Sequence, residues 1–386
     1  MEEGLIKLRV ADFLINTLKT LFGFYFLFLI FLLVGIFRLK KKSNSNNLKA
    51  TVIVPFRNEG ENLIRCISSL LQQEFDESRF EIILVDDNST DNYLDLIKDF
   101  LKLPEIKLIK LEGASGKKRA IEAGINSSQK EIIVTTDADC FHSKLWLKAL
   151  VESFDDKTGF VAGKVVYSNA KNIFEELQEI EFASLVSIGA AFIGNKIPLL
   201  ANGASCAYRK ELFFRVGGFH DNLNLVSGDE EFLMQKIHFD TEYEVKFCAL
   251  EQSVAYTEPI SEIQKFINQR KRWVSKVPFY RNKLLLPVLV MLYLFYLTGL
   301  ISLFVSFFNQ QVACAFINIF VLKSLIDFVF MLRGYSLLEL SKNISNILKL
   351  LILFPVAEVF HLFYISIVPI LSQLTGFQWK GRSFKR

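Results

Sequence analysis

Apolar positions divide the chain into two ends and a middle. Four apolar runs are long enough to cross a bilayer as helices, namely residues 18–37, 284–308, 312–332 and 347–371. The middle mixes charged and apolar positions, as a globular domain does, and it is long enough to bury its own core. We therefore expect a transmembrane anchor with a basic linker over residues 1–48 and a globular domain over residues 49–283. A C-terminal membrane region of about three spans would occupy residues 284–386.

Within the globular domain, short apolar strands alternate with amphipathic helices. The expected strands are residues 50–55, 81–85, 106–111 and 131–136, and the helices between them are residues 61–73, 91–101 and 117–125. This alternation predicts a parallel sheet that is covered by helices on both faces. Ligands of such sheets bind at the carboxyl ends of the strands, so the chemistry is expected there.

A basic cluster, residues 38–42, directly follows the first apolar run. A cleaved signal peptide is excluded because the run is too long and lacks a small-residue cleavage site. Basic residues beside a span mark the cytoplasmic side. We therefore expect an integral protein of the plasma (inner) membrane with its domain in the cytoplasm. The net charge of +4 is small and this cluster supplies much of it, so no nucleic-acid partner is expected.

Acidic residues follow three of the four expected strands, in the segments VPFRNE (54–59), DDNSTD (86–91) and TTDADC (135–140). Carboxylates at three strand ends would converge on one crevice, where their charge is costly unless a cation or hydrogen-bond donors are present. Asp137 and Asp139 form a D-x-D triplet that can reach one hard cation, which can also bridge a diphosphate. A solvated acidic turn gives the same letters, but the apolar strand before the triplet favours the metal site.

Two further features suit a nucleoside diphosphate. The carboxylate of Asp87 can accept a hydrogen bond from the imide N–H of uracil, whereas Ser89 or Thr90 is expected to cap the next helix. Gly116 and Lys117 open a helix with cations that suit a phosphate. A solvated basic helix face is the alternative, and the spacing excludes a P-loop.

Two later segments are each open to two interpretations. In SGDEEF (227–232), a carboxylate at the start of a helix can act as a general base on an acceptor hydroxyl, or it can simply stabilise the helix dipole. We apply the dipole interpretation to Glu230 and Glu231. QRKRW (269–273) is either an interfacial basic helix or part of the active site. In the second case Arg272 neutralises a departing diphosphate, and Arg270→Lys is expected to be mild.

The segments VPFRNE, DDNSTD, GKKRA, DAD, GDEEF and QRKRW, in this order, resemble the inverting family 2 glycosyltransferases with the GT-A fold. The resemblance covers about residues 49–276. The Q-x-x-R-W element is similar to that of membrane-integrated members. These include ceramide glucosyltransferases and the cellulose, chitin, hyaluronan and poly-N-acetylglucosamine synthases. The implied fold is α/β, a GT-A nucleotide-sugar-binding domain with a Rossmann-like mixed sheet and flanking transmembrane helices.

The resemblance also implies an activity, that of a metal-dependent inverting hexosyltransferase. Asp139, helped by Asp137, would bind Mg²⁺ or Mn²⁺, and Asp229 would be the general base. The other implied catalytic residues are Gln269, Arg272 and Trp273, and the implied donor-binding residues are Pro55, Arg57, Glu59, Asp87, Lys117 and Asp137. The donor would be a UDP-sugar. One departure is that processive synthases usually read T-E-D where this chain has Ser-Gly-Asp at residues 227–229.

The acceptor remains open between two classes. About four spans are few for a polymer pore, which favours transfer of one sugar to a lipid or lipid-linked acceptor. A processive synthase that extends a growing glycan is the alternative. An inactive nucleotide-binding membrane subunit is disfavoured because Asp139, Asp229 and Arg272 are all present.

The C-terminal tail poses a conflict of topology. Three spans after a cytoplasmic domain would leave the basic residues of 379–386 outside, against the positive-inside rule. A re-entrant hairpin over residues 347–371, broken near Pro355, would return the tail to the inside. The same run also contains Glu358 and His361, which are unusual in a membrane span.

Overall fold

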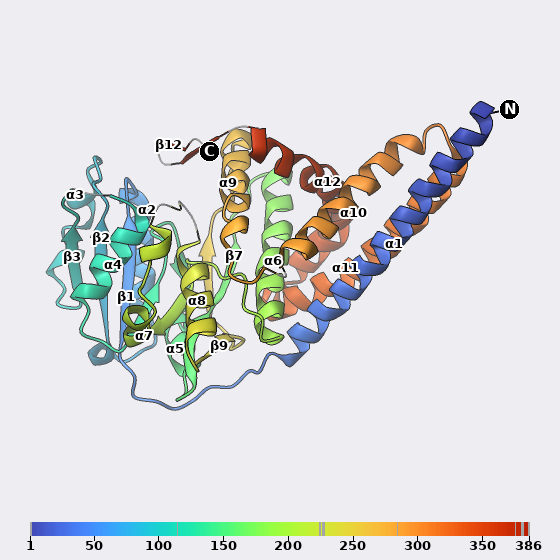
Figure 1. Cartoon of the computed structure of the whole chain (residues 1–386). Helices are drawn as coiled ribbons and strands as arrows, with labels where there is room; N and C mark the ends of the chain where they lie inside the picture. Colours follow the sequence, from blue (N-terminus) through green and yellow to red (C-terminus); the bar gives the residue numbers. More distant parts are fainter. Residues whose placement is uncertain are drawn as a thin grey trace. The chain divides into compact units, whose positions relative to one another are not determined.

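A computed structural model describes residues 2–113, 115–223, 225, 228–283, 285–374, 376–379 and 382–384 (Figure 1). The chain forms two compact units. The sheet unit comprises Gly35–Pro259 and Leu337–Glu339, and the helix unit comprises Met1–Val34, Ile260–Ser336 and Leu340–Arg386. Each unit buries apolar side chains of its own.

The sheet unit is built on a seven-stranded mixed sheet with the order β3-β2-β1-β4-β8-β6-β9. Its strands are β1 (Ala50–Phe56), β2 (Phe80–Asp86), β3 (Ile106–Lys110), β4 (Ile132–Thr135), β6 (Thr158–Ala162), β8 (Cys206–Arg209) and β9 (Glu244–Phe247). β1 pairs in parallel with β2 and β4, whereas β8 runs antiparallel to β4 and β6. The four strands expected from the apolar pattern are therefore confirmed. Because the chain moves outward from β1 to β3 and restarts with β4 on the other side of β1, the sheet has a switch point there, where ligand crevices form.

Helices and a smaller sheet complete this unit. The helices are α2 (Gly60–Leu71), α3 (Tyr93–Ile97), α4 (Lys117–Ser127), α5 (Trp146–Glu152), α6 (Ile173–Gly194), α7 (Lys210–Arg215) and α8 (Asp229–Asp240), with 3₁₀ turns η1 (Glu77–Arg79), η2 (Phe100–Lys102) and η3 (His220–Asn222). The second sheet has the order β5-β10-β7, formed by β5 (Phe141–His142), β10 (Val254–Thr257) and β7 (Lys164–Tyr167).

Close packing of α4 against β1 brings the start of α4 to the switch point. A Cβ atom on Gly124 of α4 would lie 2.8 Å from Cγ2 of Ile53 in β1, closer than side chains approach one another. Glycine at this position therefore lets the helix lie directly on the sheet. The first residue of α4 is Lys117, which the sequence assigned to donor binding.

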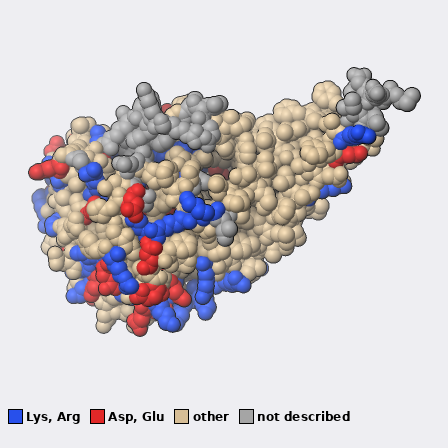
Figure 2. Space-filling view, in the orientation of Figure 1, with Lys and Arg blue, Asp and Glu red and all other residues tan. Residues whose placement is uncertain are grey.

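The helix unit contains α1 (Glu2–Arg38, through Val34), α9 (Ile263–Val274), α10 (Leu285–Val305), α11 (Gln310–Leu337) and α12 (Ile344–Leu374). It also contains the 3₁₀ turns η4 (Val277–Phe279) and η5 (Leu340–Lys342) and the hairpin β11 (Phe377–Trp379) and β12 (Arg382–Phe384), of which β11 packs against α9. The visible surfaces of α1, α10 and α11 carry few charged side chains, as lipid-facing helices do (Figure 2).

In the described part of the chain, five helices are long and apolar enough to cross a membrane: α1, α6, α10, α11 and α12. Burial separates α6 from the others, because 67% of its apolar window is buried, against 22% to 33% for the other four. α6 packs against β7 and β9, so its apolar residues form part of the core of the sheet unit. The four apolar runs of the sequence thus correspond to α1, α10, α11 and α12, whose apolar windows are mostly exposed.

The structure does not contain the re-entrant hairpin that was one of the two possibilities for residues 347–371. Pro355 and Pro369 both lie inside α12, a single helix of 31 residues. Proline is tolerated within such a helix because neighbouring helices and local backbone adjustment compensate for the missing N–H.

Candidate active site

The two aspartates at the end of β2 have different environments. Asp86 is occupied by its own turn, because its Oδ1 accepts from the backbone N–H of Ser89 at 2.7 Å and its Oδ2 accepts from the Tyr93 hydroxyl at 2.9 Å. The expected capping role of Ser89 or Thr90 is wrong, since α3 begins later and Asn92 precedes it. Asp86 therefore shapes the loop.

Asp87 connects the ends of β1 and β2 with the start of α4. Its backbone N–H donates to the Phe56 carbonyl at 2.8 Å, and its own carbonyl accepts from the Arg57 guanidinium at 3.2 Å. Its Oδ1 accepts from the Gly116 N–H at 2.8 Å, directly before α4. Asp87 and Arg57 thus lie together where β1, β2 and the start of α4 meet, and their assignment to donor binding stays a prediction.

Pro55 lies in β1, and Glu59 directly precedes α2. Pro55 is buried within β1, and the Glu59 carboxylate accepts from the Asn62 side chain at 2.6 Å at the start of α2. Their local roles are to end β1 and to begin α2.

The D-x-D triplet follows β4. The Oδ1 of Asp137 lies 2.6 Å from Nζ of Lys117, and the Asp139 side chain is exposed, while its carbonyl accepts from Arg65 at 3.3 Å. Within the described ranges, no group of three or more His, Cys, Asp or Glu side chains gathers as a metal site. Two carboxylates are hard oxygen ligands that suit Mg²⁺ or Mn²⁺, so the remaining coordination positions would have to come from a diphosphate and water.

His142 is not a proton acceptor for this site, although it lies just after the triplet. Its two ring nitrogens are hydrogen-bonded to the hydroxyls of Ser69 at 3.0 Å and Thr136 at 2.7 Å. Burial lowers the pKa of His142 to about 3. A histidine of that pKa stays neutral and supports the fold.

The three acids that open α8 are all buried, at 7%, 3% and 4% exposure for Asp229, Glu230 and Glu231. Asp229 lies 3.4 Å from Nζ of Lys118, which also donates to the Leu225 carbonyl at 2.6 Å. Burial lowers the pKa of Lys118. Asp229 is therefore held beside α4, as its assignment to the site requires.

Lys117 links the D-x-D triplet to α8. Burial acts to lower its pKa, but the carboxylates of Asp137, Glu230 and Asp229 outweigh burial and raise it, so Lys117 is a permanent cation. Burial, opposed by Lys117 and reinforced by Asp229 and Asp137, raises the pKa of Glu230 to about 7. Sequence reasoning missed Glu230, because a charged first helical turn has the same letters whether it is solvated or buried.

The residues of α9 belong to the helix unit. The Gln269 side-chain oxygen accepts from Arg270 at 3.0 Å, and the Arg270 guanidinium lies 4.5 Å from the ring centre of Phe266 and 4.2 Å from that of Trp273. Arg270 is 1% exposed, and lysine cannot stack as a plane between two rings, so Arg270→Lys is a poor choice of control for a basic surface position. The sheet unit therefore contains Asp87, Lys117, Asp137 and Asp229. The helix unit contains Gln269, Arg272 and Trp273.

Residues 51–216 match the glycosyl transferase family 2 profile. The matched range runs from β1 to α7, and it includes Asp87, Lys117 and the D-x-D triplet but ends before α8 and α9. This part of the chain is thus similar to the glycosyl transferase family 2.

Similar proteins agree with this domain. The poly-beta-1,6-N-acetyl-D-glucosamine synthase of Staphylococcus epidermidis is 34% identical over 33% of this chain and 31% of its own length. "Probable glycosyltransferase YdaM" of Bacillus subtilis is 25% identical over 61% of this chain and 56% of its own length. The chain thus spans about a third and just over half of these two relatives.

The fold also matches a solved structure, the mannosyltransferase PcManGT of Pyrobaculum calidifontis in complex with GDP-Man and Mn²⁺, with a TM-score of 0.56. The match covers 92% of this chain and 99% of the mannosyltransferase, at 15% identity. It shows the fold, and the expected GT-A-like α/β domain with flanking apolar helices is confirmed.

Proposed function

We propose that the chain is a membrane-bound, metal-dependent glycosyltransferase that moves a sugar from a UDP-sugar, with inversion, to a lipid or lipid-linked acceptor. The observation that carries the proposal is the position of Lys117, 2.6 Å from Asp137 and under the charge of Asp229 and Glu230. A donor-side carboxylate and acceptor-side carboxylates therefore share one half-buried cation at the switch point of the sheet.

The donor would bind along the ends of β1, β2 and β4. Asp87, fixed by Arg57 and Gly116, would accept from the uracil imide, and Lys117 would face the diphosphate. Asp139 and Asp137 would hold Mg²⁺ or Mn²⁺, which supplies positive charge to the leaving diphosphate when it is bound. The Pyrobaculum mannosyltransferase, which has this fold and was solved in complex with GDP-Man and Mn²⁺, supports the pairing of a nucleotide sugar with a divalent metal.

The transfer would be a direct displacement at the anomeric carbon. A carboxylate at the start of α8, Asp229 according to the motif, would accept the proton of the acceptor hydroxyl as the new bond forms. Arg272 would neutralise the UDP leaving group. An α-linked donor would then give a β-linked product.

A processive synthase is the second candidate, and the staphylococcal polysaccharide synthases favour it. The four helices with exposed apolar surface favour the single transfer, because few spans are available to enclose a polymer. Both candidates share the donor chemistry and differ in what happens after the first sugar.

The test is product analysis. The purified full chain in nanodiscs would be incubated with Mn²⁺, extracted lipids and a panel of UDP-sugars that includes UDP-N-acetylglucosamine. Mass spectrometry would then determine the masses of the products. We expect free UDP and a lipid heavier by one sugar. A ladder of sugar masses would select the synthase, and the absence of any glycosylated product from the whole panel would contradict the proposal.

A further inference from the structure

The two carboxylates that open α8 differ in their partners. Asp229 lies beside Lys118, whose ammonium group is also fixed by the Leu225 carbonyl. Oε1 of Glu230 is a buried atom that has no hydrogen-bond partner among the described residues. One carboxylate is therefore engaged with the fold, and the other has an oxygen available for a hydrogen bond.

Glu230 is also held close to the D-x-D strand end. A Cβ atom on Gly203 would lie 2.2 Å from Oε2 of Glu230, so the backbone at Gly203 lies against the carboxylate, and a larger residue there would displace the Glu230 side chain. The next residue, Ala204, accepts through its carbonyl from the Thr136 hydroxyl at 2.9 Å, directly before Asp137. The loop that contacts Glu230 is thus fastened to the strand that presents the donor-side carboxylates.

A buried carboxylate oxygen without a partner is costly, because water is lost and nothing replaces it. Such a group is retained where a reaction requires it, and a position between a donor-side and an acceptor-side element is where a transferase needs a base. Asp229 does not meet this description, since its charge is balanced by the neighbouring Lys118.

We propose that Glu230, rather than Asp229, takes the proton of the acceptor hydroxyl, an inference that rests on the proposed function. The acceptor oxygen forms its bond to the anomeric carbon while its proton passes to Oε1 of Glu230. The bond between the anomeric carbon and the diphosphate oxygen breaks, and its electron pair leaves on the diphosphate. Asp229 then has a positioning role, in which it fixes Lys118 and the start of α8.

The surroundings of Glu230 set its basicity. The groups that act on it are Lys117 and Lys118 from α4, Asp137 from the end of β4, Asp229 on its own helix, and Cys206 and Tyr208 from β8. Burial and the neighbouring carboxylates raise the pKa of Glu230 to about 7, against the attraction of Lys117. A base must be ionised to accept a proton, so turnover should increase as the pH rises through about 7.

Three single substitutions on one helical turn test the proposal: Glu230→Gln, Asp229→Asn and Glu231→Gln, the last as the matched buried control. The assay would use UDP-N-acetylglucosamine, or the UDP-sugar of the panel that gives most product, with the lipid extract. We expect Glu230→Gln to lose about 100-fold to 10,000-fold in turnover with UDP affinity within about threefold of wild type. Asp229→Asn should stay within about tenfold and Glu231→Gln within about threefold.

The pH profile gives an independent readout. The rise near pH 7 should persist in Asp229→Asn and Glu231→Gln and be absent from the residual activity of Glu230→Gln. A larger loss in Asp229→Asn than in Glu230→Gln, or a rise near pH 7 that survives in Glu230→Gln, would overturn the proposal. If Glu230→Gln does not fold, Glu230→Asp replaces it, and this variant should be slow but keep the rise. Failure of the proposed function is distinguishable, because the wild-type chain would then form no product at all.

Discussion

Each of the two units contains a cluster of one lysine and two carboxylates. The two clusters differ in how completely their carboxylate oxygens are hydrogen-bonded. In the helix unit, Lys323 of α11 donates to Asp327 at 2.6 Å and to Glu358 of α12, and the Tyr25 hydroxyl of α1 donates to Asp327 at 2.7 Å. In the sheet unit, Lys117 contacts Asp137, and Glu230 has an oxygen without a partner among the described residues. The first cluster joins three helices, whereas the second leaves a carboxylate oxygen available for chemistry.

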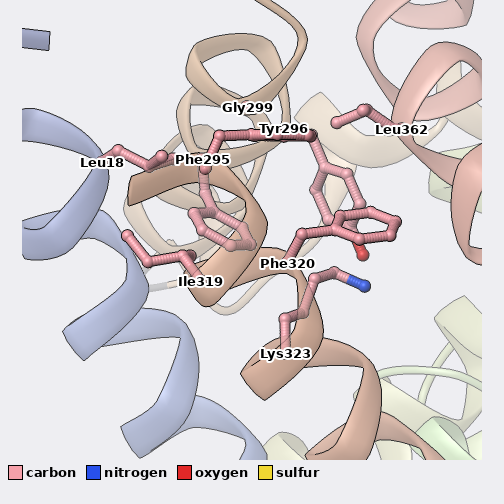
Figure 3. A pocket seen from close by; sticks show the side chains of 9 residues that line it. Leu18, Phe295, Tyr296, Gly299, Ile319, Phe320, Lys323 and Leu362 are labelled. Atoms are coloured by element: carbon pink, nitrogen blue, oxygen red, sulfur yellow. The ribbon is translucent and has the colours of Figure 1, made fainter. Parts of the chain in front are cut away.

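The cavity beside Lys323 supports the architectural role of the first cluster. It measures about 20 Å³ and is lined by Lys323 and by mostly apolar residues of α1, α10, α11 and α12, such as Phe295, Gly299 and Leu362 (Figure 3). A cavity of about this size holds one water molecule and no sugar or lipid headgroup. Buried charges in a membrane helix are expensive, so complete pairing is what an architectural cluster requires.

Lys323→Met should produce the largest effect on stability. It leaves Asp327 and Glu358 buried together without their cation, which costs about 3–5 kcal/mol in known buried pairs. The thermal midpoint in detergent would measure this loss. A triple replacement of Lys323, Asp327 and Glu358 by Met, Leu and Leu should recover most of it. An unchanged midpoint for Lys323→Met would show that the cluster does not hold the helices together.

Arg272→Lys should produce the next largest effect, on turnover. If Arg272 clamps the leaving diphosphate, lysine lacks the planar fork that holds two oxygens, and turnover should fall about tenfold to a thousandfold. The control is Lys265→Arg on the same helix, because Lys265 is 68% exposed and pairs with Glu262. Equal and small changes in both variants would remove Arg272 from the active site and leave α9 as an interfacial helix.

Glu230→Gln should stabilise the fold at pH 8, in contrast to Lys323→Met. The pKa of Glu230 is raised from its ordinary 4.5 to about 7, so the folded state binds more protons than the unfolded state between these values. Stability contributed by the protonated form is therefore lost as the pH rises from about 4.5 to 7. Glutamine does not ionise, and the gain should be about 1–3 kcal/mol at pH 8 and close to zero below about pH 4. Destabilisation at pH 8 would mean that the carboxylate has a structural role.

Tyr25→Phe should produce the smallest effect. The substitution removes the hydroxyl that donates to both oxygens of Asp327 and keeps the ring that stacks on Phe295 with centres 4.8 Å apart. A loss of about 1 kcal/mol is expected for one buried hydrogen bond, with turnover unchanged. Phe22→Leu on the same helix is a control for the ring contact alone. A turnover defect in Tyr25→Phe without loss of stability would indicate that the helix-unit cluster acts in catalysis.

The local pattern of the sequence was enough for the parallel half of the sheet and for the four exposed apolar helices. The apolar runs of β1, β2, β3 and β4 can be recognised in the sequence without knowledge of the fold. A parallel sheet then brings the acidic residues that follow these strands to one edge. The antiparallel β8 was not predicted, because its place between β4 and β6 depends on pairing with distant strands. α6 was not distinguished as a core helix for the same reason.

The site could be predicted as a set of positions, with less success for the environment of each side chain. Asp87 directly follows β2 and accepts from the Gly116 N–H, so the residue after Gly116, Lys117, begins α4 at the switch point. The contact of Glu230 with the loop at Gly203 joins segments 27 residues apart, whereas Arg270 lies against Phe266 and Trp273 of its own helix α9. Their letters alone are compatible with a solvated helix turn and a basic interfacial helix.

Metal dependence tests the central claim most directly, because the proposed transfer needs a cation at Asp137 and Asp139. Release of UDP and formation of glycosylated lipid would be measured for the wild-type chain with Mn²⁺, after removal of metal by EDTA, and after Mn²⁺ is restored, with Asp139→Asn in parallel. We expect product with Mn²⁺, none in EDTA, recovery on restoring the metal, and none with Asp139→Asn. Full turnover in EDTA with no metal detectable in the protein, or full turnover of Asp139→Asn, would contradict the account.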